Sequence, residues 1–430
     1  MRDLVIVLIV GLGSLYALRK PWIGILVWEW LGIMNPHRYT YGFAYSAPLA
    51  AVTAGATLLG FMFTRQKRSP VRGAPMYWLL ALVVWMTLSW LLGLDVAGDY
   101  DQWNKVMKID LMLFVALGVL ITREQIVAFT VVVTASVALL AVKGGLFTLM
   151  TGGSYRVWGP PDSFISDNNE FALATVMTIP LVRFVQMQVK TRWLQLALTA
   201  SMVLCGAAAL GSQSRGALLA VAGMLAVFWF RGGNKLRNGF LIALLAVPLI
   251  AFMPASWSER MSSIDHYQDD GSAMGRINAW HVAWRIALDH PLGVGFNPAT
   301  HEIFAQYAPD ANDVHAAHSI YFQILGNHGF IGLAIFLGIW IATWRSANWI
   351  RNQQGLPPEA KWAVDLASMA QVSLAAYAVG GAFLSLAYFD LPYDLTVAVV
   401  ATRYWVATRA WEKDTSEPSR WLRWLRLAPQ

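Results

Sequence analysis

The sequence has few charged residues and a single cysteine, and both shortages limit what the protein can be. Of its 430 residues, 13% are charged and 57% are hydrophobic, whereas soluble domains carry about 25% charged residues. Because so little charge cannot cover a soluble surface, we predict an all-α polytopic membrane protein. Cys205 is the only cysteine, which excludes an intrachain disulfide and a cysteine-cluster metal site.

The chain also lacks a separate basic domain. Its formal net charge is +7, but the basic residues lie in short segments between apolar runs. That distribution suits anionic lipid surfaces and short cytoplasmic loops better than a nucleic-acid duplex. The 21 tryptophans and 14 tyrosines are typical of interfacial belts. We therefore expect membrane lipids as partners and no nucleic acid.

Apolar runs follow one another through most of the chain. A helix needs roughly 20 apolar residues to cross a bilayer. The candidate runs are 4–18, 21–35, 43–64, 76–94, 103–121, 124–148, 168–187, 192–212, 214–231, 238–253, 318–344, 366–388 and 390–409. The first two are short and could form a hairpin of half-helices, so we expect about 12 transmembrane helices. The N-terminal run has no small-residue cleavage site and is interpreted as a retained span or half-span.

The basic loops give an orientation. The most basic short loop, TRQKRSPVR, is placed in the cytoplasm by the excess of Lys and Arg on that side. Counting spans from there puts the other strongly basic short connections on the same side. The predicted units are an N-terminal transmembrane bundle (1–253), a periplasmic cap loop (254–317), C-terminal transmembrane helices (318–410) and a cytoplasmic amphipathic tail (411–430).

The segment 254–328 is the one long stretch that water must reach. It holds seven of the eight histidines: His266, His281, His290, His301, His315, His318 and His328. Helical spacing of apolar residues predicts short amphipathic helices in 277–291, ending at Pro291, and in 301–308. We expect them to cover the outer membrane face with the apolar side toward lipid and the charged side toward a cavity. The alternative is a packing domain without chemistry.

Arginines at the outer ends of the spans are candidates for anion binding. Arg215 lies at a turn between two runs, Arg156 in an outer loop and Arg276 in the cap. An arginine fork suits phosphate oxygens, so such a cluster would suit a lipid-linked diphosphate. Arg285, in the predicted cap helix that follows Arg276, is a further substrate-binding candidate. The alternative for each is an ordinary surface or snorkelling arginine.

His318 is the candidate general base. We expect it to open the helix of the run 318–344, where a histidine can take up a proton near neutral pH. A cap is the alternative role. His315 lies three residues away, with Asp310 and Asp313 upstream, and such a group could bind a divalent metal ion. The nearby arginines would repel a cation and disfavour that site. His328 is expected to face the bundle interior as a structural residue.

A polar group at another outer helix start, 165–170, can be interpreted in two ways. Its members are Asp167, Asn168, Asn169 and Glu170. They could cap the helix or bind sugar hydroxyls, and Asn169 is the substrate-binding candidate among them.

Four motifs occur in order along the chain and share the outer side. They are Ser214-Arg215-Gly216, Gly275-Arg276 with Trp280, His290-Pro291 with Gly293 and Gly295, and His318-Ser319 with Gln323, Leu325 and Gly329. Together they resemble the O-antigen ligase and polymerase superfamily (WaaL-like, Wzy-C domain). The segments MNPHR, SDNNEFAL and SAMGRINAW resemble those of its subgroup of exosortase-associated O-glycosylation ligases.

The resemblance implies an inverting, metal-independent glycosyltransferase of the bacterial inner membrane that needs no cofactor. Such enzymes pass a glycan from undecaprenyl diphosphate to lipid A–core oligosaccharide in the periplasm. Transferred to this chain, Arg215 and Arg276 hold and neutralise the diphosphate, and His318 deprotonates the acceptor hydroxyl. Gln323 joins the substrate-binding candidates. Asn327 departs from relatives that carry glutamate near this point, so no carboxylate role is transferred there.

Three alternatives stay open from the sequence. A protein O-oligosaccharyltransferase and a polysaccharide polymerase would use the same donor with other acceptors. A transporter of lipid-linked sugars would carry ionisable residues through the middle of its spans, together with internal repeats. This chain concentrates its polar residues at the outer face, which favours an enzyme.

Overall fold

The computed structural model describes residues 2–231, 235–255, 257 and 271–412. Its main helices are α1 (Arg2–Ala17), α2 (Pro21–Glu29), α3 (Leu49–Phe63), α4 (Ala74–Leu91), α5 (Tyr100–Val119), α6 (Arg123–Met150), α7 (Asn168–Gln188), α8 (Arg192–Gly211), α9 (Arg215–Arg231), α10 (Lys235–Ala251), α12 (Gly271–Asp289), α13 (His301–Tyr307), α14 (Ile320–Arg351), α15 (Lys361–Gly380) and α16 (Asp390–Ala407). A π-helical segment, Trp30–Met34, extends α2. The prediction of an all-α fold is confirmed for these residues. The predicted amphipathic helix of the tail and His266 lie outside them.

Local sequence explains where several helices begin. Pro21 and Pro75 occupy first-turn positions of α2 and α4, where the missing N–H has no helical partner to lose. Thr122 begins α6 with a capping box, because its hydroxyl accepts from Gln125 N–H while the Gln125 side chain accepts from Thr122 N–H. The apolar runs between such boundaries became the helices.

The chain is a multi-pass membrane protein. Six segments among the described residues are long and apolar enough to cross a membrane: Ala74–Leu91, Arg123–Met150, Asn168–Gln188, Arg192–Gly211, Ile320–Arg351 and Pro358–Phe383. Shorter apolar helices cover Pro21–Met34, Leu49–Phe63 and Arg215–Phe230. The total of about 12 crossings stays a prediction.

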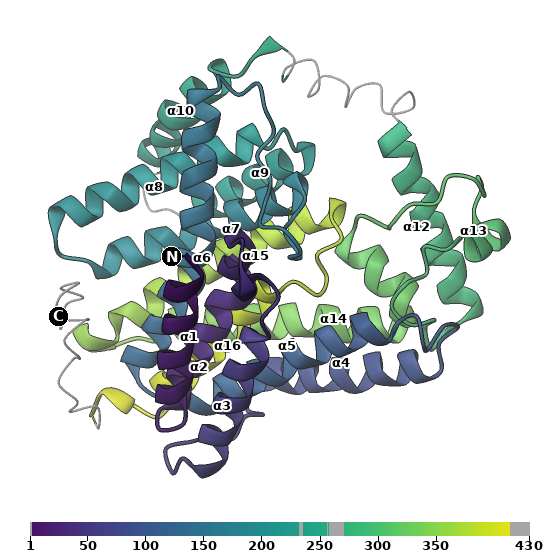
Figure 1. Ribbon diagram of the computed structural model, residues 1–430. Helices are drawn as coiled ribbons and strands as arrows, with labels where there is room; N and C mark the ends of the chain where they lie inside the picture. The colour runs from purple at the N-terminus through teal and green to yellow at the C-terminus, as the bar shows by residue number, and fades with distance from the viewer. Residues whose placement is uncertain (1, 232–234, 256, 258–270, 413–430) are drawn as a thin grey trace.

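Helix α7 is the most enclosed of the six, with 78% of its 18-residue apolar window buried. It packs against α6, α8, α9 and α15. On another side of the molecule, α14 and α4 run side by side, and α12 and α13 stand over the end where α14 begins (Figure 1). We call α12 and α13 the cap helices. The candidate residues lie where the cap helices meet the bundle.

Helix α14 differs from the continuous helix expected from 318 to 344. It begins at Ile320, is capped by Ser319 and ends at Arg351, and Gly329 interrupts it with φ 68° and ψ −173°. At the break the carbonyl of Asn327 accepts hydrogen bonds from Val294 N–H (2.9 Å) and Gly295 N–H (3.2 Å). The loop that contains His290-Pro291 therefore docks against the interrupted helix, which assigns that motif a structural role.

Carboxyl groups inside the bundle contradict the expectation that polar residues concentrate at the outer face. The side chains of Glu29, Asp110, Asp390 and Asp394 are all at most 8% exposed, on α2, α5 and α16. The sequence could not show this, because helix packing and not the apolar run decides how deeply a residue lies. A transporter would carry ionisable residues within its spans, and these buried carboxyl groups are such residues. The enzyme interpretation therefore has to rest on the site and on the family.

Candidate functional site

The starts of α7 and α9 are held together with the end of α8 at one end of the bundle. Asn168, in the first turn of α7, donates through Nδ2 to the Ser212 carbonyl in the α8–α9 turn, at 2.7 Å. The loop before α7 joins the same turn, since Val157 N–H donates to the Gly211 carbonyl at 3.2 Å. Arg215 is the first residue of α9 and is half-buried.

Trp280 on α12 connects this end of the bundle to the cap. Its ring stacks on Phe322 of α14 at 5.0 Å and lies 6.4 Å from Phe383. Phe383 in turn lies against Gly216 at the start of α9. The Trp280 indole N–H donates to the Ala317 carbonyl at 2.6 Å. Trp280 therefore connects α12, which carries Arg276, to the residue before His318 directly and to the start of α9 through Phe383.

His318 has a backbone conformation that few non-glycine residues adopt. Its φ is 42°, in the left-handed region that costs an L-residue energy. Its N–H donates to the Ser385 hydroxyl at 3.0 Å, and the capped start of α14 follows directly. The surrounding structure thus holds His318 in a fixed, strained position.

The electrostatic surroundings of His318 keep its imidazole neutral. Burial lowers its pKa most, and the neighbouring Arg276 and His315 lower it further, while Asp167 acts in the opposite direction. A neutral imidazole at pH 7 is the form that accepts a proton.

Asp167 supplies a carboxylate near the histidine. Burial would raise the pKa of Asp167, but hydrogen bonds from Glu170 and Asn169 outweigh it and lower the pKa. The side chain caps α7 by accepting from Asn169 N–H at 2.8 Å. The capping interpretation of this segment is thus confirmed for Asp167. Arg276 also acts electrostatically on Glu170, whose side chain is 9% exposed.

The start of α12 is packed against the chain that leads to His318. A Cβ at Gly275 would lie 2.9 Å from His315 Nδ1 and 3.1 Å from Asp313 Oδ2, so a larger residue would require these side chains to shift. His315 Nδ1 pairs with Asp313 Oδ1 at 2.7 Å. Asn278 holds the same segment, since its Nδ2 donates to the carbonyls of Asp310 (2.8 Å) and Asp313 (3.0 Å). Arg276 is thereby fixed beside the 313–318 segment.

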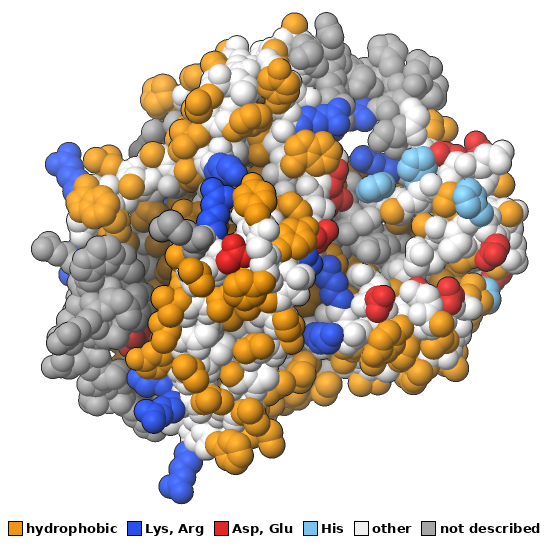
Figure 2. Space-filling model, in the orientation of Figure 1, with side chains coloured by type: hydrophobic (Ala, Val, Ile, Leu, Met, Phe, Trp, Pro, Cys, Tyr) orange, Lys and Arg blue, Asp and Glu red, His pale blue; other side chains and the backbone are white. Residues whose placement is uncertain are grey.

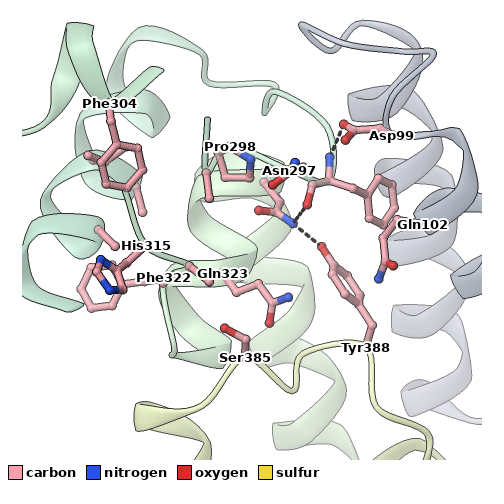
Figure 3. A pocket seen from close by; sticks show the side chains of 18 of the residues that line it. Asp99, Gln102, Asn297, Pro298, Phe304, His315, Phe322, Gln323, Ser385 and Tyr388 are labelled. Carbon is pink, nitrogen blue, oxygen red and sulfur yellow. Dashed lines mark hydrogen bonds between the residues drawn. The ribbon is translucent and has the colours of Figure 1, made fainter. Parts of the chain in front are cut away.

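A cavity of about 440 Å³ opens beside these residues. Figure 2 shows acidic, basic and histidine side chains gathered around a hollow between the cap helices and the bundle. The lining polar side chains are Asp99, Asp101, Gln102, Asn297, His315, Gln323, Asn327, Ser385 and Tyr388. Aromatic rings of Phe296, Phe304 and Phe322 complete the wall (Figure 3). Amides, carboxylates and aromatic rings are groups that bind the hydroxyls and apolar faces of sugars.

The candidate residues differ in where the structure places them. Arg276, His315 and His318 lie within electrostatic reach of one another, and Gln323 and His315 line the cavity. Arg156 is exposed in the loop that packs on the α8–α9 turn. The Asn169 side chain donates to Asp167 Oδ1 at 2.9 Å. Among the described histidine, cysteine and acidic side chains, no group of three or more has the arrangement of a metal site.

Arg285 is the candidate that the structure does not bring to the site. It lies nine residues after Arg276 on α12, and at about 100° per residue this places the two on opposite faces. The expectation that the charged side of the cap helices faces the cavity is therefore wrong for α12. Ala279, Val282 and Ala283 of α12 face the cavity, while Arg285 is exposed. Packing of α12 on α14 and α13 uses its small apolar residues.

Sequence reasoning missed the polar group at the base of the cavity. Tyr388 Oη accepts from Asn327 Nδ2 at 2.8 Å and contacts His328 Nε2 at 2.7 Å, and His328 Nδ1 contacts Ser89 Oγ at 2.6 Å. Asp99 Oδ2 accepts from Phe296 N–H at 2.5 Å. The interior position expected for His328 is confirmed, since it is fully buried. Tyr388 and Asp99 have no motif around them and could not be found without the fold.

Comparison with known protein families agrees with the class that this fold and site define, a multi-pass membrane protein with a charged site at one end of its helices. Residues 200–337 match the family model described as O-Antigen ligase (Wzy_C), and residues 1–191 match a family of unknown function (DUF5935). No curated protein matches the chain. The match over residues 200–337 supports the O-antigen ligase superfamily, whose members are glycosyltransferase-like enzymes. The O-antigen ligase match spans Arg215, Arg276 and His318.

Proposed function

We propose that the protein is an inverting O-antigen ligase. It would transfer a glycan from undecaprenyl diphosphate to lipid A–core oligosaccharide on the periplasmic side of the bacterial inner membrane. The observation that carries this proposal is His318, held in a left-handed conformation beside Arg276, with its pKa lowered by burial and by that arginine. A neutral base beside a fixed cation suits a reaction that deprotonates a hydroxyl and releases an anion.

The proposed reaction is a single displacement. The His318 imidazole takes the proton of an acceptor hydroxyl, and the oxygen attacks the anomeric carbon of the donor glycan. The bond from that carbon to the diphosphate oxygen breaks, and its electron pair leaves with undecaprenyl diphosphate. Arg215 and Arg276 would stabilise the negative charge on the leaving diphosphate, and Asp167 would stabilise the imidazolium that forms.

The cavity is proposed to bind the acceptor sugar. Its lining carries carboxylates, amides and aromatic rings and no Lys or Arg among the described residues, so it favours an uncharged sugar over a phosphate. Gln323 and His315 would contact that sugar. Arg156, in the loop before α7, and Asn169, in the first turn of α7, would contact the donor. Arg285 has no role in this arrangement.

Replacement of the two arginines tests the diphosphate assignment. Arg215→Ala and Arg276→Ala should each raise the KM for the lipid-linked donor more than the corresponding Lys variants, because Lys keeps the charge while losing the fork. The effect on the acceptor KM should be small. Equal losses with Ala and Lys would show that geometry and not charge is required.

A competition between acceptors tests the function. Purified protein would receive an undecaprenyl-diphosphate glycan together with lipid A–core, a serine- and threonine-rich peptide and free glycan. We expect labelled lipid A–core as the main product. Transfer to the peptide would identify a protein O-oligosaccharyltransferase, and extension of the glycan a polymerase. Absence of any transfer, with the donor intact, would contradict the proposal. Activity in excess chelator is expected to be unchanged.

A further inference from the structure

A second cavity, of about 630 Å³, lies between α4 and α14 at the other end of the bundle. Its wall is apolar along most of its length and ends at two arginines. The lining residues are Ala74, Trp78, Ala334, Gly338, Ile341, Ala342, Arg345, Trp349 and Arg403. Arg345 comes 16 residues after the break at Gly329, which at 1.5 Å per residue places it roughly 24 Å along the helix from that break, and the cavity shares no lining residue with the first one. The cavity is therefore separate from the candidate active site.

The α14 wall of this cavity is a row of small side chains. Ala334, Gly338 and Ala342 recur every four residues and so share one face of the helix. Trp78 of α4 packs directly over Gly338, where a Cβ would lie 2.7 Å from its ring. Ala334 and Trp78 are exposed. A groove of this kind, open along a membrane helix, fits a hydrocarbon chain.

Among the described residues, the two arginines at the end of the groove have no acidic partner. Arg403 Nη1 donates to the Ser346 hydroxyl at 2.9 Å, and its guanidinium lies 5.2 Å from the Trp349 ring centre. Arg345 is exposed. Neither arginine forms an ion pair within the part of the chain that the structure describes, and no carboxylate lines the cavity. The positive charges of Arg345 and Arg403 would therefore favour a bound anion.

Further positive charge surrounds the same end of the bundle. Arg68 and Arg72, from the basic loop 64–73, lie over the ring of Tyr404, at 4.3 Å and 4.6 Å. Tyr404 follows Arg403 in the chain. This loop is the one that the sequence assigns to the cytoplasmic side, where membranes carry anionic lipid.

We propose that this cavity is a binding site for an anionic phospholipid of the cytoplasmic leaflet. Arg345 and Arg403 bind the headgroup phosphate by charge-assisted hydrogen bonds, and an acyl chain lies along Ala334, Ile341 and Ala342. The Trp78 ring, packed on Gly338, lies beside the chain. The lipid would fill the gap between α4 and α14 and stabilise their packing.

Lipid binding to the purified full-length protein tests this proposal. Native mass spectrometry would compare phosphatidylglycerol with phosphatidylcholine of identical acyl chains, and soluble glycerol phosphate would report binding of phosphate alone. We expect preferential retention of phosphatidylglycerol and none of glycerol phosphate. Arg345→Gln should weaken phosphatidylglycerol binding about fivefold and Arg345→Gln/Arg403→Gln roughly 25-fold, the range for basic side chains at an anionic surface.

Two control variants separate this site from general attraction. Arg65→Ala removes an exposed charge from the same basic loop without touching the cavity and should leave retention within twofold. Ala334→Phe fills the open groove and should reduce binding of both lipids. Equal retention by wild type and Arg345→Gln, a loss with Arg65→Ala as large as with Arg345→Gln, or binding of glycerol phosphate as tight as that of the lipid would overturn the proposal.

Discussion

At the scale of single residues, His318 combines backbone strain with a controlled charge. Its left-handed conformation is fixed by the hydrogen bond from its N–H to Ser385. Burial and the Arg276 charge lower its pKa, and Asp167 opposes them. The balance keeps the imidazole able to accept a proton near neutral pH while providing a carboxylate for the imidazolium.

The pH dependence of transfer should report that balance. Activity requires neutral His318, so it is present above the histidine pKa and is lost as the pH falls through it. Because that pKa is lowered, the acid limb should lie below the usual value of about 6.5. Arg276→Gln removes a neighbouring positive charge and should move the limb to higher pH. Asp167→Asn keeps a capping side chain and should move it to lower pH.

Initial rates at saturating donor and acceptor, measured from pH 4.5 to about 8, would give the position of the limb independently of its height. A limb that stays at the same pH in both variants would show that another group is being titrated.

At the scale of elements, the break in α14 at Gly329 positions the loop that contains His290 and Pro291. Gly329 has φ 68° and ψ −173°, a pair essentially confined to glycine, and a Cβ there would overlap the Pro291 carbonyl oxygen. Gly355 has the same φ of 68° but nothing within 4 Å of its Cβ position. Gly355 therefore reports the cost of a positive φ alone, whereas Gly329 adds an unfavourable ψ and the close approach to Pro291.

Gly355→Ala should lower the free energy of unfolding by about 1 kcal/mol, the usual cost of a left-handed L-residue. Gly329→Ala adds a clash with backbone and should cost several times more, roughly 3 kcal/mol or above. Thermal unfolding in one detergent would compare them. Equal losses of stability would mean that the loop at Pro291 moves away without cost.

The elements show what the sequence can and cannot predict. Apolar runs and caps predicted most helices within a few residues, and spacing predicted both cap helices. The break at Gly329 and the face that α12 turns to the cavity depend on neighbours that come from other parts of the chain. Sequence motifs identified Arg276 and His318 as candidates. Tyr388 and Asp99 lie in no motif, and only the packing of α5, α14 and the 385–388 segment places them at the cavity.

At the scale of the whole molecule, the account places the cap helices and the anionic-lipid cavity on opposite sides of the membrane. A cysteine introduced by His301→Cys, on exposed α13, should react with a membrane-impermeant thiol reagent in intact cells. One introduced by Gln354→Cys, between α14 and α15, should react only after permeabilisation. Cys205 is buried and gives little background. The reverse pattern would invert the orientation and move the active site to the cytoplasm.

The central claim is that His318 is the general base of glycan transfer. The most direct test is the rate of in vitro transfer by His318→Ala beside His301→Ala, which removes an exposed histidine of the cap. Loss of a general base typically costs about 10²–10⁴-fold, so His318→Ala should fall by that factor while His301→Ala transfers at the wild-type rate. Transfer by a folded His318→Ala protein within a few-fold of wild type would contradict the account.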